Sequence, residues 1–338
     1  MSDTENKEKT AGEKMKETAQ LLKSVSPTPH VRDKVSTSYL MGMVIAALMP
    51  AEIYGIWHFG PRALVITLIS IASCIFFEWG FDKIIKKKST VGDLSCVVTG
   101  LLLAMNLPVA VPLWIPVIGA FVAIVVVKML FGGLGQNFMN PALGARCFLV
   151  LSFARYMTDF SYKPGWGGAD VVSSATPLAR LKAGESVDLM QMFIGNEGGT
   201  IGETSAVALL LGGVFLIACG VITWHVSLCY IVSLLAFTAV FGGRGFDITY
   251  LGGQLYGGGL MLGAFFMATD YVTRPITRKG QVIYGIFLGI LTGIFRVFGP
   301  GAEGVSYAII IGNLIVPLIE KITVPRHFGY KKPAKEVA

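Results

Sequence analysis

Charged residues are scarce in this chain. Only 14% of its 338 residues are Asp, Glu, Lys or Arg, whereas 53% are hydrophobic, and the mean hydropathy is +0.65. A soluble protein of this size needs more charged residues than this on its surface. Most of the chain must therefore be solvated by lipid. The composition excludes an ordinary soluble globular protein and predicts an integral membrane protein.

Residues that bind redox metals are also few and dispersed. No CxxC pair occurs, and the chain contains neither a Rossmann fingerprint nor a phosphate-binding loop. Haem, zinc and iron–sulfur sites need ligands at defined spacing, so we expect no metal centre held by this chain alone. We interpret the five cysteines as small core residues in apolar stretches: Cys74, Cys96, Cys147, Cys219 and Cys229.

The basic residues lie in short clusters beside apolar segments. Residues 1–36 form a polar leader with seven Lys/Arg and six Asp/Glu and no apolar run, so we expect no cleaved secretory signal. The net charge of +7 comes from clusters that flank apolar segments, which is typical of charge-oriented membrane proteins. We therefore expect a membrane-lipid environment and no nucleic-acid partner.

Runs of apolar residues predict about ten transmembrane helices, since about 20 residues are needed to cross a hydrocarbon layer of ~30 Å. The fold class is therefore an all-α polytopic membrane protein. The predicted segments are 38–57, 62–80, 94–107, 112–130, 141–157, 205–223, 226–241, 255–269, 281–298 and 305–322.

The charge distribution predicts the sidedness of the connections. A cytoplasmic N-terminus places the basic clusters at 83–88, 274–279 and 326–335 inside, together with the C-terminus. The acidic connection 158–204 then lies outside. The predicted organisation is a leader at 1–36, a first membrane half at 37–157, an extracytoplasmic loop at 158–204, a second half at 205–323 and a basic tail at 324–338.

Two halves of five segments would have opposite orientations, which is typical of inverted repeats. The third and eighth segments occupy equivalent places, and both are short for a membrane crossing. Broken helices are tolerated at membrane depth where protein or a wet cavity satisfies the backbone, so we infer a central site at these two segments. The alternative is that glycines such as Gly252, Gly257 and Gly263 serve close helix packing, and the two interpretations are compatible.

The stretch "SSATPLA" stands out in the outer loop. Thr176 followed by Pro177 is typical of a helix start, because Thr caps a backbone N–H and Pro is well placed at the first helical position. That capping role explains the pair but not the small residues Ser173, Ser174 and Ala175 before it.

This stretch resembles the flavinylation motif Ser/Thr-Gly-Ala-Thr of a family that comprises the RnfD component of the Rnf complex and the NqrB component of the sodium-pumping NADH:quinone oxidoreductase. The stretches "GGLGQNFMNPALGARCF" and "SYAIIIGNLIVPLIE" resemble the same family. The resemblance implies a phosphoester between FMN and Thr176, made by a flavin transferase. Ser174 departs from the motif, in which glycine is commoner.

The residues themselves suit this chemistry. A phosphoester needs an accessible hydroxyl, small neighbours leave room for a modifying enzyme, and a helix starting at Pro177 would direct its N-terminal dipole at the phosphate. A tethered flavin can carry one or two electrons between partners. The family resemblance further implies a second, noncovalent flavin. The helix start at Asn140–Pro141 could bind the polar edge of that flavin or an ion; the alternative is that it is only a helix cap.

Ionisable residues in apolar segments are costly and mark candidate ion pathways. Snorkelling or an interfacial ion pair accounts for Glu78, Lys128, Arg296 and Glu320. Asp93 and Asp270 differ, because each flanks a short segment on the cytoplasmic side. We expect this pair to handle the coupling cation. The other candidates near apolar segments are Glu52 and Arg146.

The resemblance implies a subunit of an ion-translocating oxidoreductase in a bacterial or archaeal cytoplasmic membrane, not catalytic alone. It would relay electrons between ferredoxin and NAD, coupled to Na⁺ or H⁺ movement. Its partners would include a second flavin-bearing subunit and iron–sulfur and NADH-binding subunits. The alternatives are the related NADH:quinone oxidoreductase subunit, disfavoured by the leader of about 36 residues, and a small-solute channel or transporter.

Overall fold

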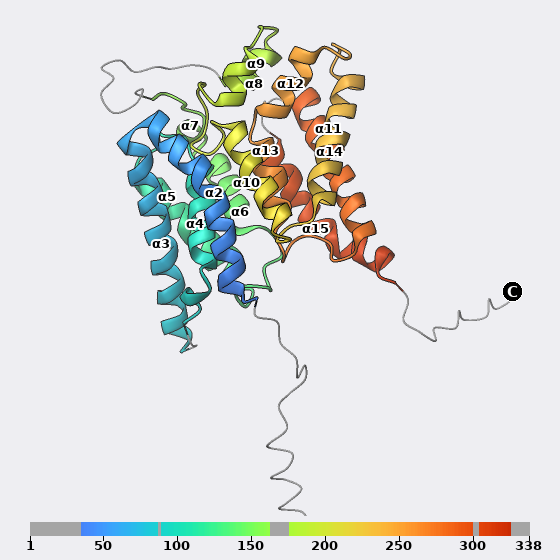
Figure 1. Ribbon diagram of the computed structural model, residues 1–338. Coiled ribbons are helices and arrows are strands. Elements are labelled where there is room, and N and C mark those ends of the chain that lie inside the picture. The colour runs from blue at the N-terminus through green and yellow to red at the C-terminus, as the bar shows by residue number, and fades with distance from the viewer. Residues whose placement is uncertain (1–34, 87–88, 163–175, 300–303, 326–338) are drawn as a thin grey trace, which may run out of the picture. The chain divides into compact units, whose positions relative to one another are not determined.

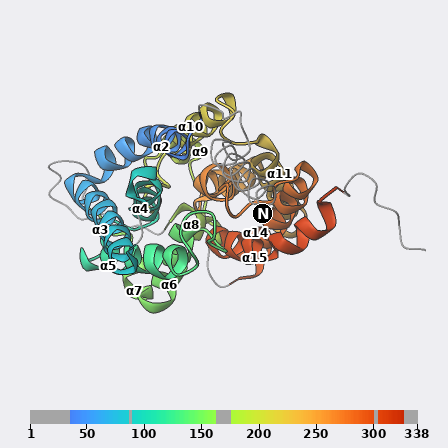
Figure 2. The same cartoon turned by 90° about the horizontal axis from the view of Figure 1, so that it is seen from below.

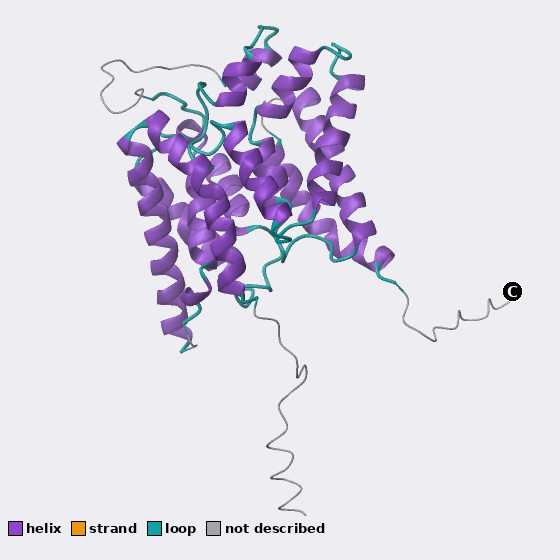
Figure 3. Cartoon of the chain, viewed as in Figure 1, coloured by secondary structure: helices purple, strands orange, loops and turns teal. Residues whose placement is uncertain are grey.

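The computed structural model describes residues 35–86, 89–162, 176–299 and 304–325. The chain divides into the units Met1–Thr37 and Ser38–Ala338, and the fold described below is that of the second. The described residues contain many helices and no strand, and an isolated β-bridge pairs Pro108 with Thr200 (Figure 3). The prediction of an all-α protein is confirmed for this part of the chain.

The first group of helices carries the blue to green colours of Figure 1. In it, α3 packs against α4 and α5, and α6 packs against α4, α5 and η2. Its elements are α2 (Thr37–Phe59), α3 (Pro61–Ile85), the 3₁₀ turn η1 (Val91–Asp93), α4 (Ser95–Met105), α5 (Trp114–Phe121), its π-helical continuation η2 (Val122–Met129), α6 (Pro141–Ser152) and α7 (Ala154–Met157).

The second group follows two short helices, α8 (Pro177–Lys182) and α9 (Leu189–Ile194). Here α11 and α14 lie side by side, and α15 packs against both α14 and α6. Figures 1 and 2 agree that α2 to α5 lie on one side and α11, α14 and α15 on the other. The elements are α10 (Ala206–Ala218), α11 (Trp224–Phe241), α12 (Ile248–Tyr256), α13 (Leu260–Leu262), the π-helical η3 (Gly263–Met267), α14 (Arg278–Phe298) and α15 (Val305–Thr323).

Within the described ranges, five helices are long and apolar enough to cross a membrane, namely α2, α3, α11, α14 and α15. The other apolar helices are shorter: α4 has 11 residues, which corresponds to a length of about 16 Å. The chain is thus a membrane protein that combines long apolar helices with shorter ones. The short third segment is confirmed as a helix that cannot cross the hydrocarbon layer alone.

The eighth segment differs from its predicted bounds of 255–269. α12 starts at Ile248, where Asp247 caps it by accepting a hydrogen bond from the Thr249 amide (2.9 Å). It ends at Tyr256, and the chain turns through Gly258 and Gly259, whose φ values of +64° and +66° suit glycine, before α13 begins. The segment is therefore two pieces with a break between them, because an Asp cap and a glycine pair override its continuous apolar pattern.

Glycines also permit close helix packing. Along α14, a side chain at Gly285, Gly289 or Gly293 would collide with backbone or side-chain atoms of α11. A side chain at Gly263 would meet Val305 of α15. Both interpretations of the glycines are supported: small residues let helices approach, and the pair after α12 makes the break.

Candidate functional site

Thr176 caps α8. Its hydroxyl accepts a hydrogen bond from the Ala179 amide (3.4 Å), and Pro177 occupies the first helical position. The predicted cap is confirmed, while Ser173, Ser174 and Ala175 lie outside the described residues. In Figure 1, α8 and α9 lie at the end of the helices where α2 stops, opposite the end of α3 at Ile85.

A cavity of about 540 Å³ opens beside Thr176. This volume lies within the ~300–1,000 Å³ range of sites that enclose cofactors and drug-sized ligands. Apolar walls with a few polar groups suit a three-ring flavin tethered through its phosphate. The cavity is lined by Arg146, Cys147, Val150, Met157, Thr158, Phe160, Thr176, Ala179, Gly258, Phe295, Gly299, Val305, Ser306 and Tyr307.

Thr176 also lines a smaller, acidic hollow. Glu197 and Glu203 line this hollow of about 30 Å³. Burial raises the pKa of Glu197, an effect opposed by Arg180, whose guanidinium lies 3.6 Å from its carboxylate. Thr176 thus lines both an apolar cavity and a hollow that contains two carboxyl side chains.

Arg146 joins several elements at the wall of the large cavity. Its guanidinium donates to Asn106 Oδ1 (2.8 Å) at the end of α4 and to Ser306 Oγ (3.1 Å) in α15, and lies 3.5 Å from Glu203 Oε1. All four residues are buried or nearly so. The sequence marked Arg146 as a costly intramembrane charge, but residue spacing gave no signal for its partners.

The break after α12 adjoins the same cavity through Gly258. Arg296 of α14 donates to the carbonyl oxygens of Gln254 (2.5 Å), Gly257 (2.9 Å) and Gly258 (3.2 Å). Carbonyls freed by the break are therefore satisfied by protein, as required at membrane depth. Arg296 is buried and does not snorkel, so that interpretation was wrong, because these carbonyls hold it inside.

The third and eighth segments meet, as inferred for a central site. The amide nitrogen of Asn106, which follows α4, lies 3.9 Å from the sulfur of Met267 in η3. Asn140 connects the same region: its Oδ1 accepts from the amides of Ala142 (3.0 Å) and Leu143 (3.3 Å), and its Nδ2 donates to the Met267 carbonyl (3.4 Å). The predicted cap at Asn140–Pro141 is confirmed.

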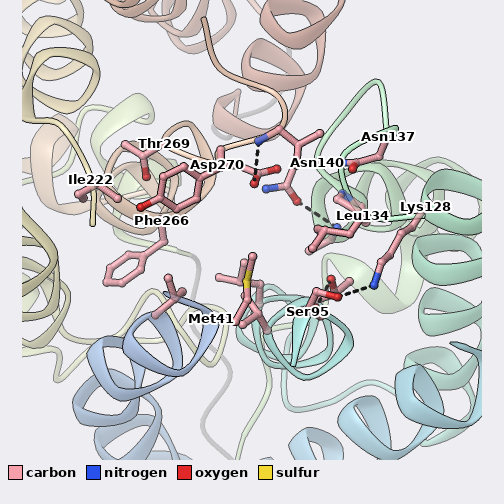
Figure 4. Close-up of a pocket in the computed structure, with 18 of the residues that line it drawn as sticks. Met41, Ser95, Lys128, Leu134, Asn137, Asn140, Ile222, Phe266, Thr269 and Asp270 are labelled. Carbon is pink, nitrogen blue, oxygen red and sulfur yellow. Dashed lines mark hydrogen bonds between the residues drawn. The ribbon is translucent and has the colours of Figure 1, made fainter. Parts of the chain in front are cut away.

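A second, smaller cavity of about 70 Å³ lies between the two groups of helices. Figure 4 shows Asp270 and Asn140 across from Ser95, with Lys128 reaching Ser95 from the side. Asp270 accepts from the Thr273 hydroxyl (3.2 Å). Asn137 is buried, and its Oδ1 has no hydrogen-bond partner among the described residues.

A chain of polar contacts leads from this cavity into the first group of helices. The Lys128 ammonium is 2.6 Å from both Glu78 Oε2 and Ser95 Oγ, and Ser95 donates to Asp93 Oδ1 (2.5 Å). Beyond Glu78, Thr90 contacts Glu78 (2.7 Å) and Asp82 (3.0 Å). We call this set, Asp93, Ser95, Lys128, Glu78, Thr90 and Asp82, the polar chain.

Of the two interpretations given for Glu78 and Lys128, the polar chain supports an ion pair and excludes snorkelling. Their side chains are 0% and 2% exposed, so they form an ion pair inside the protein and not at its surface. Asp82 was not singled out, although its position four residues after Glu78 places both on one face of α3. Asp270 lines the small cavity, whereas Asp93 reaches it through Ser95.

The sequence as a whole matches one family. The model of the NQR2, RnfD, RnfE family covers residues 24–329. This chain belongs to that family. The resemblance stated from the motifs is therefore confirmed over most of the chain.

Members of this family include close relatives of the chain. It is 46% identical to the D component of the Na⁺-translocating ferredoxin:NAD⁺ oxidoreductase complex of Acetobacterium woodii, over 93% of this chain and 97% of the relative. It is 40% identical to the D component of the proton-translocating ferredoxin:NAD⁺ oxidoreductase complex of Clostridium ljungdahlii, over 91% of this chain and 97% of the relative. It is 33% identical to the D component of the ion-translocating oxidoreductase complex of Actinobacillus succinogenes, over 90% of this chain and 98% of the relative.

Proposed function

We propose that this chain is the membrane subunit of an Rnf-type complex that carries FMN on Thr176. It relays electrons in ferredoxin:NAD oxidoreduction coupled to Na⁺ or H⁺ translocation, and it is not catalytic alone. The observation that carries the proposal is the Thr176 hydroxyl, which caps α8 at the edge of a 540 Å³ apolar cavity in a chain of this family. The names of the relatives favour the Rnf complex over the NADH:quinone oxidoreductase.

The residues around Thr176 have separate tasks in this mechanism. The bound flavin supplies one- and two-electron transfer, which no side chain here offers. Thr176 would hold the phosphate through its side-chain oxygen, and the N-terminus of α8 would favour the negative charge there. Val150, Met157 and Phe295 line the cavity and would give the flavin ring an apolar wall. The tether would keep the cofactor on this subunit between electron transfers.

We place the Thr176 loop outside the cytoplasm and both termini inside, in the cytoplasmic membrane of a bacterium or archaeon. The basic clusters support this orientation. We further propose ten spans in two inverted halves, at residues 37–157 and 205–323. The element order supports this, because each half contains two helices, then a short or broken segment, then two more helices. Ser173, Ser174 and Ala175 would admit the flavin transferase.

The small cavity is our candidate for the coupling cation. Asp270 lines it directly, and Asp93 connects to it through Ser95 and Lys128. A cavity of 70 Å³ holds an ion with a few waters. It is smaller than a flavin ring requires, so the second, noncovalent flavin at the Asn140–Pro141 helix start stays a prediction.

Asp93→Asn and Asp270→Asn should each reduce cation transport per electron by roughly ten- to hundredfold, because a contact to a charged group contributes about 1.5–3 kcal/mol. Flavin content should stay unchanged. The measurement is cation uptake by vesicles that contain the intact complex, with flavin quantified in the same preparation. Asp188→Asn is the control, since it changes an exposed acid that caps α9 and asparagine caps equally well. Full transport in both variants would remove the two residues from the pathway.

The partners we propose are the other Rnf-type subunits: a second flavin-bearing subunit and subunits with iron–sulfur clusters and an NADH site. The relatives' names describe a complex, which supports such partners. The chain cannot receive electrons from soluble carriers by its own motifs.

A small-solute transporter is the second candidate, favoured by the broken α12–α13 segment and the small central cavity. Visible absorbance separates the two functions. The purified full chain, made in cells with its flavin transferase, should show the two absorption bands of flavin and remain yellow after denaturation. A colourless protein would favour the transporter.

A further inference from the structure

The cavity beside Thr176 has one charged side chain among the described residues that line it, and that residue is Arg146. Its side chain is 7% exposed, so its charge is screened by little water. A fixed charge acts strongly on any other charge that appears in such a site.

Three elements hold the guanidinium in place. Asn106 after α4, Ser306 in α15 and Glu203 before α10 all contact it. The contact with Glu203 is 3.5 Å, longer than the about 2.7–2.9 Å of a close charge-assisted hydrogen bond. The Glu203 carboxylate therefore opposes the positive field of Arg146 at close range. Glu203 itself lines the small acidic hollow that Thr176 also lines.

We propose that Arg146 sets the reduction potential of the flavin attached to Thr176, with Glu203 as its opposing charge. This inference rests on the proposed function. Two-electron reduction adds two electrons and one proton to the flavin ring, so the product carries one more negative charge than the reactant. The electrons come from a one-electron carrier of a neighbouring subunit, and the proton comes from water. A cation at the cavity wall stabilises the reduced ring, whereas a carboxylate destabilises it.

The two residues therefore have opposite effects. Loss of the Arg146 charge makes the flavin harder to reduce, and loss of the Glu203 charge makes it easier. A residue that only holds the helices together would not produce shifts of opposite sign. Arg146→Lys keeps the positive charge but loses the planar guanidinium group. The flavin in this variant should therefore keep most of its wild-type reduction potential.

The experiment is a spectroelectrochemical titration of the full-length, flavin-loaded chain in detergent, with soluble mediators as the electron source. Arg146→Gln should lower the ratio of reduced to oxidised flavin at a fixed potential by at least tenfold, which is about 30 mV for a two-electron couple. Glu203→Gln should raise that ratio. Arg155→Gln is the matched control, because Arg155 is exposed on α7 and does not line the cavity.

Potentials that are unchanged in the two glutamine variants, or shifted in the same direction, overturn the role of Arg146. If Arg146→Gln does not fold, the other two variants decide. A raised ratio of reduced to oxidised flavin in Glu203→Gln, together with a near-native ratio in Arg146→Lys, supports the role. Any other pair of results overturns it. Wild-type protein without covalent flavin overturns the proposed function and this inference together. Flavin-loaded variants with unaltered potentials overturn the inference alone.

Discussion

Thr176→Ala is expected to remove all covalent flavin from the chain. The linkage needs an oxygen at this position, and alanine has none. After denaturing electrophoresis, the wild-type band should fluoresce under ultraviolet light and the variant band should be dark. The loss should be complete, because the phosphoester is a covalent bond and no weaker contact survives denaturation.

The cap of α8 would be lost with the same substitution, at a cost of about 1 kcal/mol, so two further variants separate the effects. Thr176→Asn keeps a good cap but offers no hydroxyl, and it should also be dark. Thr158→Ala removes another hydroxyl from the same cavity and should stay fluorescent. Fluorescence that persists in Thr176→Asn would mean that the flavin is attached elsewhere.

Lys128→Ala is expected to destabilise the protein by about 3–5 kcal/mol, because it removes the cationic partner of the buried Glu78 side chain. Thermal unfolding in detergent, followed by the loss of helical signal, measures the change. Lys83→Ala is the matched control: this lysine is exposed and lies over Trp79, so its removal should change stability by less than about 1 kcal/mol.

The double variant Glu78→Leu, Lys128→Met tests whether charge is the cause. Replacing a buried ion pair by apolar side chains is often neutral or stabilising, so the double variant should recover most of the lost stability. Cation transport should not recover with it if the polar chain serves the ion pathway. A double variant as unstable as Lys128→Ala would show that packing, and not an unpaired charge, explains the loss.

Local patterns predicted the features that depend on neighbouring residues. The caps at Thr176 and Asn140 follow from a polar residue before proline, and the long helices follow from apolar runs bounded by charge. The all-α class and the short third segment follow from the same runs. These features require no knowledge of which helices meet.

Tertiary contacts could not be predicted in the same way. Glu78 and Lys128 lie 50 positions apart, and Arg146 and Asn106 lie 40 apart, so nothing in their spacing indicates a contact. For the same reason, the sequence did not show that Glu78 pairs with Lys128 or that backbone carbonyls after α12 hold Arg296 inside the protein. The start of α12 was missed because the Asp247 cap lies before the apolar run that defined the segment.

The attachment of the flavin is tested most directly by mass spectrometry of the peptide that contains Thr176, prepared from active native membranes. We predict that this peptide carries the added mass of FMN and that fragmentation places it on the threonine. Recovery of the peptide only in its unmodified form, from membranes that still couple electron transfer to cation transport, would contradict the account.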